Sequence, residues 1–344
     1  MKAHLALLLI TMAATLAWLL APWAVRVCRA KGLLAGADDR HIHKTPTPHG
    51  GGFILPLVIT PLGLAAVWLL QLPFAPFLSV LLIASLLVAW VGWLDDHHHL
   101  QPRLRLAVHL LAVGIGLMFL PQLFDEFPLW VEKILLLLGW GWFVNLYNFM
   151  DGADGLATTE AIFISLALAL IVPPFAPLAL LIAAAATAFL RVNAPPAKVF
   201  MGDVCSTWLG YVLGGLLLVA CADDTWTVIW PLATITLVFS ADATLTLLRR
   251  IAQGHAPWQP HRTFWFHRFL ALGSSHRRLI TMVAILNLAL LAIAKTSLLF
   301  ASSTASAIGF AGGILLIILA LSVITHLEKQ HKQHKGSHHA KSKA

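Results

Sequence analysis

Apolar residues occur in long runs along the whole chain, interrupted by short segments rich in polar residues, glycine and proline. A helix needs about 20 predominantly apolar residues to cross a bilayer. Windows of this size predict about eleven spanning helices. They lie near residues 5–24, 53–71, 76–94, 104–121, 130–148, 158–173, 175–191, 205–222, 226–247, 279–299 and 305–326. The predicted fold class is all-α, a polytopic membrane helical bundle.

Basic residues predict which side of this bundle faces the cytoplasm. Lys and Arg crowd the cytoplasmic loops of membrane proteins. With the N-terminus outside, all but three of the 23 Lys and Arg residues fall in inner loops; the exceptions are Lys2, Lys133 and Lys295. The predicted orientation is therefore N-out and C-in.

One integral membrane domain is expected over residues 1–327. Its inner loops are predicted at residues 26–52, 95–104, 149–157, 192–204 and 248–278. The run VPPFAP marks a turn between the sixth and seventh spans. Residues 328–344 form a basic, His-rich segment that is expected to be a cytoplasmic tail.

Composition excludes a soluble protein and gives no support to a nucleic-acid partner. The chain is 59% hydrophobic and 11% charged, with a mean hydropathy of +0.83, whereas soluble domains carry about 25% charged residues. The net charge of +8 follows from the basic inner loops, and no basic stripe alternates with exposed aromatics. The three cysteines lack metal-ligand spacing.

The segment VGWLDDHHHL places Asp95 and Asp96 side by side at the inner end of the third span. Two carboxylates about 4 Å apart repel by roughly 4 kcal/mol at an effective dielectric near 20, and the membrane edge adds a desolvation cost. A bound cation or a shared proton would relieve both costs. A hydrated helix end is the simpler alternative.

The segment NLYNFMDGADGLA gathers four polar side chains where an apolar helix ends: Asn145, Asn148, Asp151 and Asp154. Residues three apart are neighbours on a helix face, so both amides are expected to point roughly the same way as Asp151. Amides can recognise a polar ligand, and carboxylates can hold a hard cation. A helix cap needs only one such residue, which favours a functional site.

Two later inner segments carry matching chemistry. Asp203 follows Gly202 at the start of a span, where it suits either a metal-binding carboxylate or an ordinary helix cap. The long loop that follows contains six arginines, among them Arg262, and guanidinium groups suit phosphates. His261 and His267 could join them. Asp242, within a span, is a further functional candidate.

Inner carboxylates and cations together predict a site for a divalent metal and a polyphosphate at the membrane surface. Mg²⁺ takes one or two carboxylates plus phosphate oxygens. A transporter would instead place its polar groups near the bilayer midplane, so an enzyme acting on a lipid headgroup is favoured. A transporter or flippase of lipid-linked intermediates stays open as an alternative, as does an inactive scaffold.

These segments, in this order, resemble the polyprenyl-phosphate N-acetylhexosamine-1-phosphate transferases, glycosyltransferase family 4. The blocks that carry the resemblance are TPTPHGGG, LDDHHHL, NLYNFMDGADGLA, VFMGDVCSTWLG and HRTFWFHRFLALGSSHRR. The resemblance implies transfer of an N-acetylated amino-sugar 1-phosphate from a UDP-sugar to undecaprenyl phosphate, which yields UMP. It also implies Mg²⁺, with Mn²⁺ as the alternative ion, and a bacterial cytoplasmic membrane with the site facing inward.

The resemblance also implies roles for individual residues. Asp203 matches the family's metal aspartate. Asp95 and Asp96 match its aspartate pair, for which a general-base role toward the lipid phosphate is proposed. Asn148, Asp151 and Asp154 match the nucleotide and metal-side cluster, and Phe200 the position near the uracil. Arg262 and His267 match the loop that grips diphosphate and sugar. Together these predict catalytic, substrate-binding and metal residues, the last being Asp203 and Asp151.

Three positions depart from the family pattern. Phe264-Trp265-Phe266-His267 keeps only the last histidine of the His-x-His-His block, which speaks against the muramoyl-pentapeptide branch and favours the O-antigen or surface-polysaccharide branch. Cys205 replaces a glycine, and His97 to His99 have no assigned role. One-step displacement and an aspartyl-phosphate intermediate remain open, as do a monomer and a homodimer, within surrounding membrane lipids.

Overall fold

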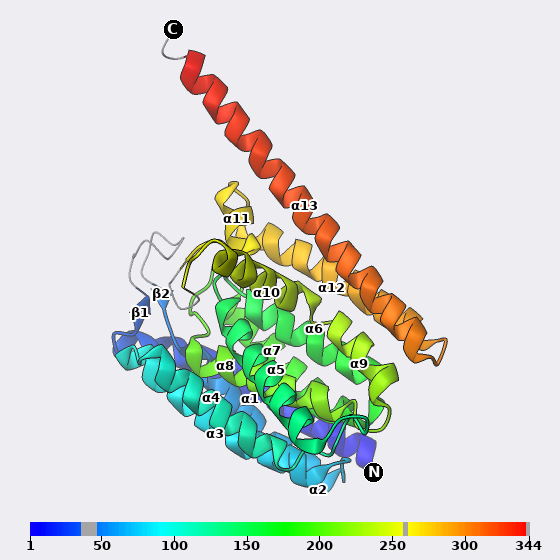
Figure 1. Cartoon of the computed structure of the whole chain (residues 1–344). Helices are drawn as coiled ribbons and strands as arrows, with labels where there is room; N and C mark the ends of the chain where they lie inside the picture. The colour runs from blue at the N-terminus through cyan, green and yellow to red at the C-terminus, as the bar shows by residue number, and fades with distance from the viewer. Residues whose placement is uncertain (36–46, 257–260, 342–344) are drawn as a thin grey trace.

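The computed structural model describes residues 1–35, 47–256 and 261–341, and they form a bundle of helices with one two-residue strand pair (Figure 1). The elements are α1 (Lys2–Ala30), β1 (Leu34–Ala35), β2 (Thr47–Pro48), the 3₁₀ turn η1 (Gly51–Phe53), α2 (Ile54–Leu69), α3 (Ala75–His98), α4 (Pro102–Leu117), α5 (Leu129–Phe149), α6 (Leu156–Ile171), η2 (Pro173–Phe175), α7 (Ala176–Asn193), α8 (Asp203–Val219), α9 (Thr225–Thr234), α10 (Leu237–Ala252), α11 (Trp265–Ala271), α12 (His276–Leu298) and α13 (Ser303–Lys341).

The all-α membrane fold is confirmed, and each predicted window coincides with one helix or one bent helix pair. Among the described residues, seven helices are long and apolar enough to span a bilayer, or eight when the bent pair counts as one span. α6 and α8 are shorter apolar helices, and α4 has only 16 residues. η2 confirms the turn that VPPFAP predicts between α6 and α7.

The window 226–247 is not one straight helix, which corrects the prediction. It consists of α9 and α10, which meet at an angle of 76°. Hydroxyl groups surround the break: Thr234 donates to Trp230 O at 2.8 Å, and Thr236 donates to Ala233 O at 2.9 Å. Hydroxyls that bond backbone carbonyls bend helices, and Pro231 removes a further backbone donor. α10 is thereby turned toward the loop that follows it.

Two features near the C-terminus differ from the sequence-based expectations. The inner loop 248–278 contains a short helix, α11, that the apolar windows do not reveal. α13 continues without a break past residue 328 to Lys341, so the basic segment begins as part of a long helix that projects from the bundle (Figure 1). The cytoplasmic location of this segment stays a prediction.

α8 is the central helix, because it is apolar on every side and nearly all of its side chains are buried. Its glycines allow neighbouring helices to approach closely. A Cβ on Gly210 would lie 2.9 Å from Val144 Cα of α5, and one on Gly214 would lie 2.6 Å from Trp140 Cδ1. The Trp140 indole also donates to Tyr211 O at 2.9 Å. α8 is therefore fixed against α5.

The same close packing sets the start of α8 against the end of α3. A Cβ on Gly92 of α3 would lie 2.4 Å from the backbone oxygen of Asp203. This contact places Asp95 and Asp96, which follow Gly92 by one turn, beside the first residues of α8. The two aspartate motifs, more than a hundred residues apart in sequence, are therefore brought to one place by helix packing.

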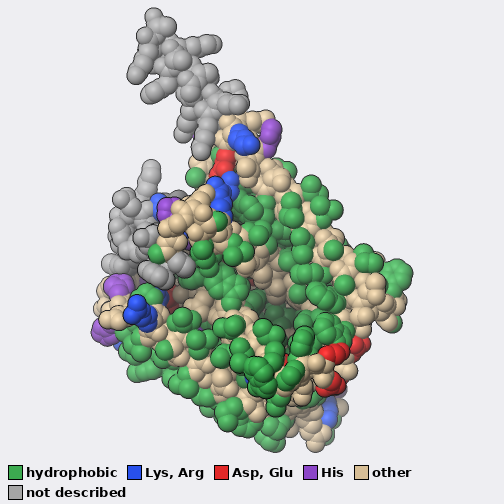
Figure 2. Space-filling view, viewed as in Figure 1, with side chains coloured by type: hydrophobic (Ala, Val, Ile, Leu, Met, Phe, Trp, Pro, Cys, Tyr) green, Lys and Arg blue, Asp and Glu red, His purple; other side chains and the backbone are tan. Residues whose placement is uncertain are grey.

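The surface divides into an apolar belt and polar ends (Figure 2). Large apolar side chains such as Trp68, Trp90 and Leu138 are more than half exposed around the bundle, as a lipid-facing surface requires. In Figure 2, Lys, Arg and His side chains gather near α11 and the loops at the left, whereas most of the visible acidic side chains lie at the opposite end. This separation agrees with the predicted orientation, which stays a prediction.

Candidate active site

Two segments far apart in sequence pair along their backbones at one edge of the bundle. Phe200 N donates to Pro48 O at 2.8 Å, and Gly51 N donates to Phe200 O at 3.0 Å. Gly50 and Gly202 both have positive φ, +82° and +81°. A Cβ on Gly202 would lie only 2.5 Å from Gly50 Cα. Glycine at both positions permits this approach. The approach fixes His49, the residue between Pro48 and Gly50, over the end of α3.

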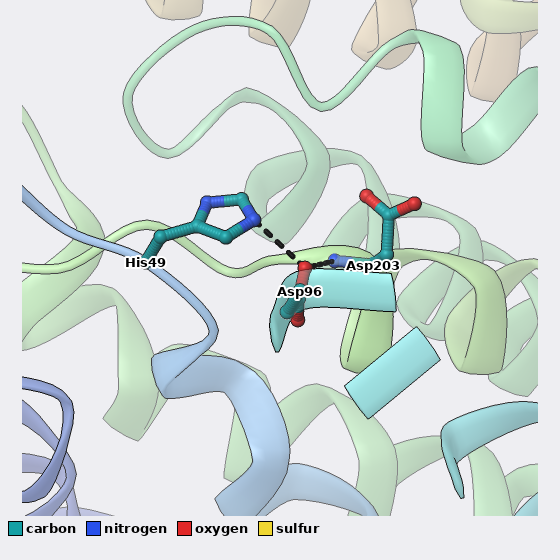
Figure 3. Close-up of side chains that lie close together, drawn as sticks. All are labelled: His49, Asp96 and Asp203. Carbon is teal, nitrogen blue, oxygen red and sulfur yellow. Dashed lines mark hydrogen bonds and ion pairs between the residues drawn. The ribbon is translucent and has the colours of Figure 1, made fainter. Parts of the chain in front are cut away.

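The Asp96 carboxylate joins these segments to α8 (Figure 3). Its Oδ1 lies 2.8 Å from His49 Nε2 and accepts the backbone N–H of Asp203 at 2.9 Å, while its Oδ2 accepts Val204 N at 3.2 Å. The Asp96 side chain is 1% exposed. The first N–H groups of a helix lack partners within that helix, so Asp96 caps α8 from a neighbouring helix.

His49 is the exposed member of this pair. Burial lowers the pKa of His49, but the neighbouring Asp96 carboxylate, with smaller contributions from Asp203 and Asp151, outweighs burial and raises the pKa to about 9. The imidazole is therefore positively charged at neutral pH. Its side chain is 31% exposed, so the pair combines a buried carboxylate with a cation that reaches the surface.

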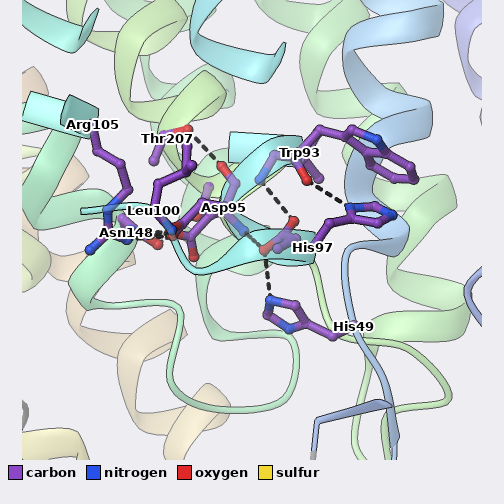
Figure 4. A network of polar contacts seen from close by, with 12 residues as sticks. His49, Trp93, Asp95, His97, Leu100, Arg105, Asn148 and Thr207 are labelled. Atoms are coloured by element: carbon purple, nitrogen blue, oxygen red, sulfur yellow. Dashed lines mark hydrogen bonds and ion pairs between the residues drawn. The ribbon is translucent and has the colours of Figure 1, made fainter. Parts of the chain in front are cut away.

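Arg105 connects Asp95, the other aspartate of the α3 pair, to α8 (Figure 4). Its Nη1 donates to Asp95 Oδ2 at 2.5 Å and to Asp203 Oδ2 at 3.0 Å. Asp95 Oδ1 accepts Leu100 N at 2.6 Å. The Asp95 side chain is 10% exposed and that of Asp203 20% exposed. Of the three carboxylates at this junction, Asp203 is therefore the most open.

The end of α5 contributes an amide to the same carboxylate. Asn148 Nδ2 donates to Asp203 Oδ2 at 3.0 Å, and Asn148 Oδ1 accepts the Ser206 hydroxyl at 2.8 Å. Asn145 behaves differently, because its amide donates to Gly141 O of the same helix at 2.7 Å. The structure thus brings one of the two predicted amides into the cluster, and the substrate-binding role predicted for Asn145 lacks this support.

Asp151 lies half-buried in the loop after α5. Burial raises its pKa well above the usual value; His49 opposes this, and the Asp203 and Asp96 carboxylates add to it. These mutual interactions place Asp151 with the cluster. Four carboxylates therefore meet around one guanidinium and one imidazole, and a divalent cation would lower the repulsion among them.

The donor set suits a hard divalent metal. Among the described residues, His49, Asp96 and Asp203 form a group whose ligand atoms all lie within 4.8 Å of one another. Asp96 already accepts two backbone N–H groups and bonds His49, and Mg²⁺ prefers oxygen ligands. Within this group Asp203, with its more exposed side chain, is therefore the carboxylate most available to such an ion. Asp151 is not a member of the group, and its predicted metal role stays a prediction.

α11 forms a second wall beside the DGADG loop. Asp242 of α10 accepts Trp265 N at 2.9 Å and Phe266 N at 3.3 Å, and so caps α11. A Cβ on Gly152 would lie 2.6 Å from the Phe266 ring and 3.3 Å from His267 Nε2. His267 is thereby held next to the residue that follows Asp151. The structure thus shows Asp242 as the cap of α11, and the further function suspected for it stays a prediction.

The inner loop that contains α11 carries two uncharged histidines, His261 and His267, and the exposed guanidinium of Arg262. Burial, helped by Arg262 and His261, lowers the pKa of His267 to about 4. Burial and Arg250 likewise lower the pKa of His261 to about 4. Arg262 is exposed. Both histidines are therefore uncharged at neutral pH, and Arg262 supplies the positive charge on this wall.

Asp154 occupies a different position from the other predicted acids. It is 2% exposed, its Oδ2 accepts Ala197 N at 3.0 Å, and its backbone N–H donates to His276 Nδ1 at 3.1 Å. These contacts join the start of α12 to the segment before α8, so the geometry indicates a structural role and does not support the predicted substrate contact. Phe200 is half-buried, and its proximity to a base stays a prediction.

Three members of the cluster were not predicted as site residues: His49, Arg105 and Ser206. His49 stands in the TPTPHGGG block, which contributes to the family resemblance, but the histidine has no pattern of its own in the sequence. Arg105 lies ten residues after Asp95 and reaches the site only because α4 folds back beside α3. No spacing rule relates Ser206 to Asn148, since their contact depends on the packing of α8 against α5.

Comparison with known proteins finds a family model that covers the part of the chain carrying this cluster. The family model for Glycosyl transferase family 4 matches residues 78–221, a range that contains Asp95, Asp96, Asn148, Asp151 and Asp203. The α11 loop lies outside the matched range.

Individual relatives extend the similarity over most of the chain. Decaprenyl-phosphate N-acetylglucosaminephosphotransferase of Mycolicibacterium smegmatis is 27% identical over 85% of this chain and 82% of the relative. The probable undecaprenyl-phosphate N-acetylglucosaminyl 1-phosphate transferase of Bacillus subtilis is 25% identical over 77% of each. The phospho-N-acetylmuramoyl-pentapeptide-transferase of Thermosynechococcus vestitus is 33% identical, over 51% of this chain and 53% of the relative. With its many apolar helices, this multi-pass membrane protein is similar over most of its length to the polyprenyl-phosphate N-acetylhexosamine-1-phosphate transferases of glycosyltransferase family 4.

Proposed function

We propose that this chain transfers an N-acetylated amino-sugar 1-phosphate from a UDP-sugar to undecaprenyl phosphate. The products are an undecaprenyl diphosphate-linked sugar and UMP. In this proposal the protein lies in a bacterial cytoplasmic membrane with its site facing the cytoplasm, and the reaction initiates an O-antigen or related surface polysaccharide. The names of the relatives, which act on decaprenyl or undecaprenyl phosphate with N-acetylglucosamine, support the reaction class.

The observation that carries the proposal is the convergence on the Asp203 carboxylate. Its Oδ2 receives Arg105 from α4 and Asn148 from α5, and Asp96 from α3 holds its backbone. The ends of α3, α4 and α5 thus meet at the start of α8, at the most open of the carboxylates Asp95, Asp96 and Asp203. Such an arrangement of carboxylates, an amide and cations suits a metal-bound diphosphate beside a lipid phosphate.

In the proposed reaction an oxygen of the lipid phosphate attacks the β-phosphorus of the UDP-sugar. The new P–O bond forms as the bond to the UMP oxygen breaks, and UMP leaves with that electron pair. Mg²⁺ bound by Asp203 and Asp151 would supply charge stabilisation of several kcal/mol. Arg105 and Arg262 counter the charge that the two anionic substrates bring together.

Among the paired aspartates, Asp95 fits a proton acceptor better than Asp96. Asp96 is 1% exposed and accepts two backbone N–H groups and the His49 contact. Asp95 is more open and shares the Arg105 guanidinium with Asp203. Any proton that the lipid phosphate retains is therefore assigned to Asp95. The competing route through an aspartyl-phosphate would retain the configuration at phosphorus, whereas direct displacement inverts it.

The experiment is release of UMP by purified protein from candidate UDP-N-acetyl sugars, with undecaprenyl phosphate and Mg²⁺. We expect release only when both substrates are present, loss with a chelator, and recovery with added Mg²⁺ or Mn²⁺. Asp203→Ala should abolish release, whereas Asp223→Ala, at an exposed carboxylate outside the cluster, should leave it unchanged. Full activity of Asp203→Ala would refute the metal assignment, and no release with any UDP-sugar would favour the inactive scaffold.

A further inference from the structure

The most exposed cation of the cluster is His49, and the proposed reaction does not yet use it. It belongs to the TPTPHGGG block, which the aspartate motifs left unexplained. Its backbone is fixed on both sides: His49 N donates to Leu33 O at 2.9 Å, and the following Gly51 N donates to Phe200 O at 3.0 Å. The close approach of Gly50 and Gly202 leaves no room for this segment to shift.

The imidazole ring is fixed as well. Its Nε2 is bound to Asp96 at 2.8 Å, and the other oxygen of Asp96 is held by a backbone N–H of α8. In the described parts of the chain, no protein group bonds the second ring nitrogen, Nδ1. Figure 3 shows the His49 ring and the Asp203 carboxylate on opposite sides of Asp96. The second ring nitrogen, Nδ1, points away from Asp96.

Buried polar groups in a folded protein are nearly always paired, but His49 is part-exposed and its Nδ1 faces away from its partner. An aspartate that orients an imidazole from one side leaves the other nitrogen available to a ligand, as in other Asp–His pairs. The His49 ring as a whole is near enough to Asp203 and Asp151 for both carboxylates to raise its pKa, and these two are the residues assigned above to the metal of the diphosphate.

We infer that His49 binds a phosphate oxygen of a substrate through Nδ1, with Asp96 holding the ring in place. This assignment rests on the proposed function and adds a substrate contact to it. Phosphate oxygens occur in both substrates, the nucleotide diphosphate and the prenyl phosphate, and the test separates the two. Asp96 accordingly acts through His49 and through the α8 backbone, as a positioning residue.

The test compares His49→Gln, His49→Arg and the wild type, with His98→Gln as matched control. Gln can still donate a hydrogen bond to Asp96 but carries no charge, whereas Arg restores a cation. His98 is an exposed histidine at the end of α3, the helix that carries Asp96, and it lies outside the hydrogen-bonded cluster. For each protein, kcat and the KM of each substrate are measured, together with the equilibrium Kd of UDP and of a short-chain prenyl phosphate.

A charge-assisted hydrogen bond lost from a site weakens binding about 10- to 100-fold. We expect His49→Gln to raise the KM and the Kd of one phosphate compound by this factor, with kcat nearly unchanged, and His49→Arg to recover part of the loss. The affected compound identifies the substrate that His49 contacts. His98→Gln should behave as the wild type.

Unchanged KM and Kd values in a folded His49→Gln protein would overturn the inference. So would a fall in kcat with both KM values and both Kd values unchanged, because that pattern belongs to a residue that does not contribute to binding of the substrates in the ground state. Gel filtration and thermal unfolding establish folding, and His49→Arg provides the second variant if His49→Gln does not fold. If the wild type releases no UMP, the proposed function fails, whereas the Kd measurements still decide whether His49 binds phosphate.

Discussion

Asp96 and Asp203 lie side by side, yet replacing each with asparagine should have different consequences for stability. Asp96 is buried and accepts hydrogen bonds from two α8 amides while it bonds His49. Asp203 is 20% exposed and lies among other carboxylates. We predict that both substitutions abolish UMP release, but that only Asp96→Asn destabilises the protein strongly.

The magnitude follows from the bonds each side chain makes. In Asp96→Asn the new side chain keeps only one acceptor oxygen, so its NH₂ group faces either Val204 N or Asp203 N and leaves that donor unpaired. An unpaired buried donor costs about 1–3 kcal/mol, and loss of a negative charge at a partly buried helix start costs up to about 2 kcal/mol. The sum for Asp96→Asn is roughly 2–4 kcal/mol.

For Asp203→Asn the balance is different. The substitution removes an attraction to Arg105, which still bonds Asp95, and it also removes repulsion from neighbouring carboxylates. We expect a net change within about 1 kcal/mol of zero, as for other part-exposed pairs. The assay is thermal unfolding in detergent without metal or substrate, followed by intrinsic fluorescence and gel filtration.

For a loss of this size, Tm should fall by roughly 5–10 °C in Asp96→Asn and change by only a few degrees in Asp203→Asn. Equal Tm values for the two variants would refute the assignment of Asp96 as the cap of α8. A large loss of stability in Asp203→Asn would show instead that this carboxylate holds the fold together and is not reserved for a metal.

Three further predictions concern α11. Asp242→Ala removes the acceptor of two α11 amides, so UMP release should fall at least about tenfold while the bundle stays folded by gel filtration. Because the pKa of His267 lies near 4, below its ordinary value, the unfolded state binds more protons between about pH 4 and 6.5; thermal stability should therefore fall across this window as the pH drops, and less so in His267→Gln. Arg268→Glu and Glu328→Arg should each lower Tm by a few degrees, and the double swap should restore most of the loss, because these side chains form a two-point ion pair between α11 and α13.

The helices themselves could be predicted from sequence because burial in lipid imposes a length. A run of about 20 apolar residues has few alternatives to a spanning helix. Each apolar window accordingly coincides with one helix or, at residues 226–247, with one bent helix pair. The break between α9 and α10 was missed since it depends on hydroxyl groups that bond the backbone locally, such as that of Thr234. Hydropathy windows do not register such bonds.

The acidic residues of the site could be predicted from the sequence for a related reason. Carboxylates at the end of an apolar run are costly to keep there, so Asp95, Asp96, Asp151 and Asp203 were conspicuous in the sequence. Asp154 shares this signature, yet it ties α12 to a neighbouring loop. Spacing on one helix face cannot tell a side chain that faces a site from one that faces another helix.

The cationic residues of the site could not be picked out from the sequence, because a bundle with basic inner loops contains many Lys, Arg and His residues that could serve as its cations. Arg105 is one of numerous inner arginines, and only the return of α4 along α3 brings it within 3.0 Å of Asp203. His49 is one of 17 histidines. Its place beside Asp96 depends on the backbone pairing of residues 48–51 with Phe200, which is a long-range contact.

The contact between Gly50 and Gly202 also dictates when during synthesis the protein becomes competent. His49 and both aspartates of α3 emerge from the ribosome well before residue 202, and chains fold from the N-terminus as they are made. Until the segment before α8 arrives, Pro48 and Gly51 lack their Phe200 partner, and Asp96 has no helix start to cap. A nascent chain that stops short of α8 would thus sit in the membrane with an incomplete site, because Asp203 and the helix start that Asp96 caps are still missing.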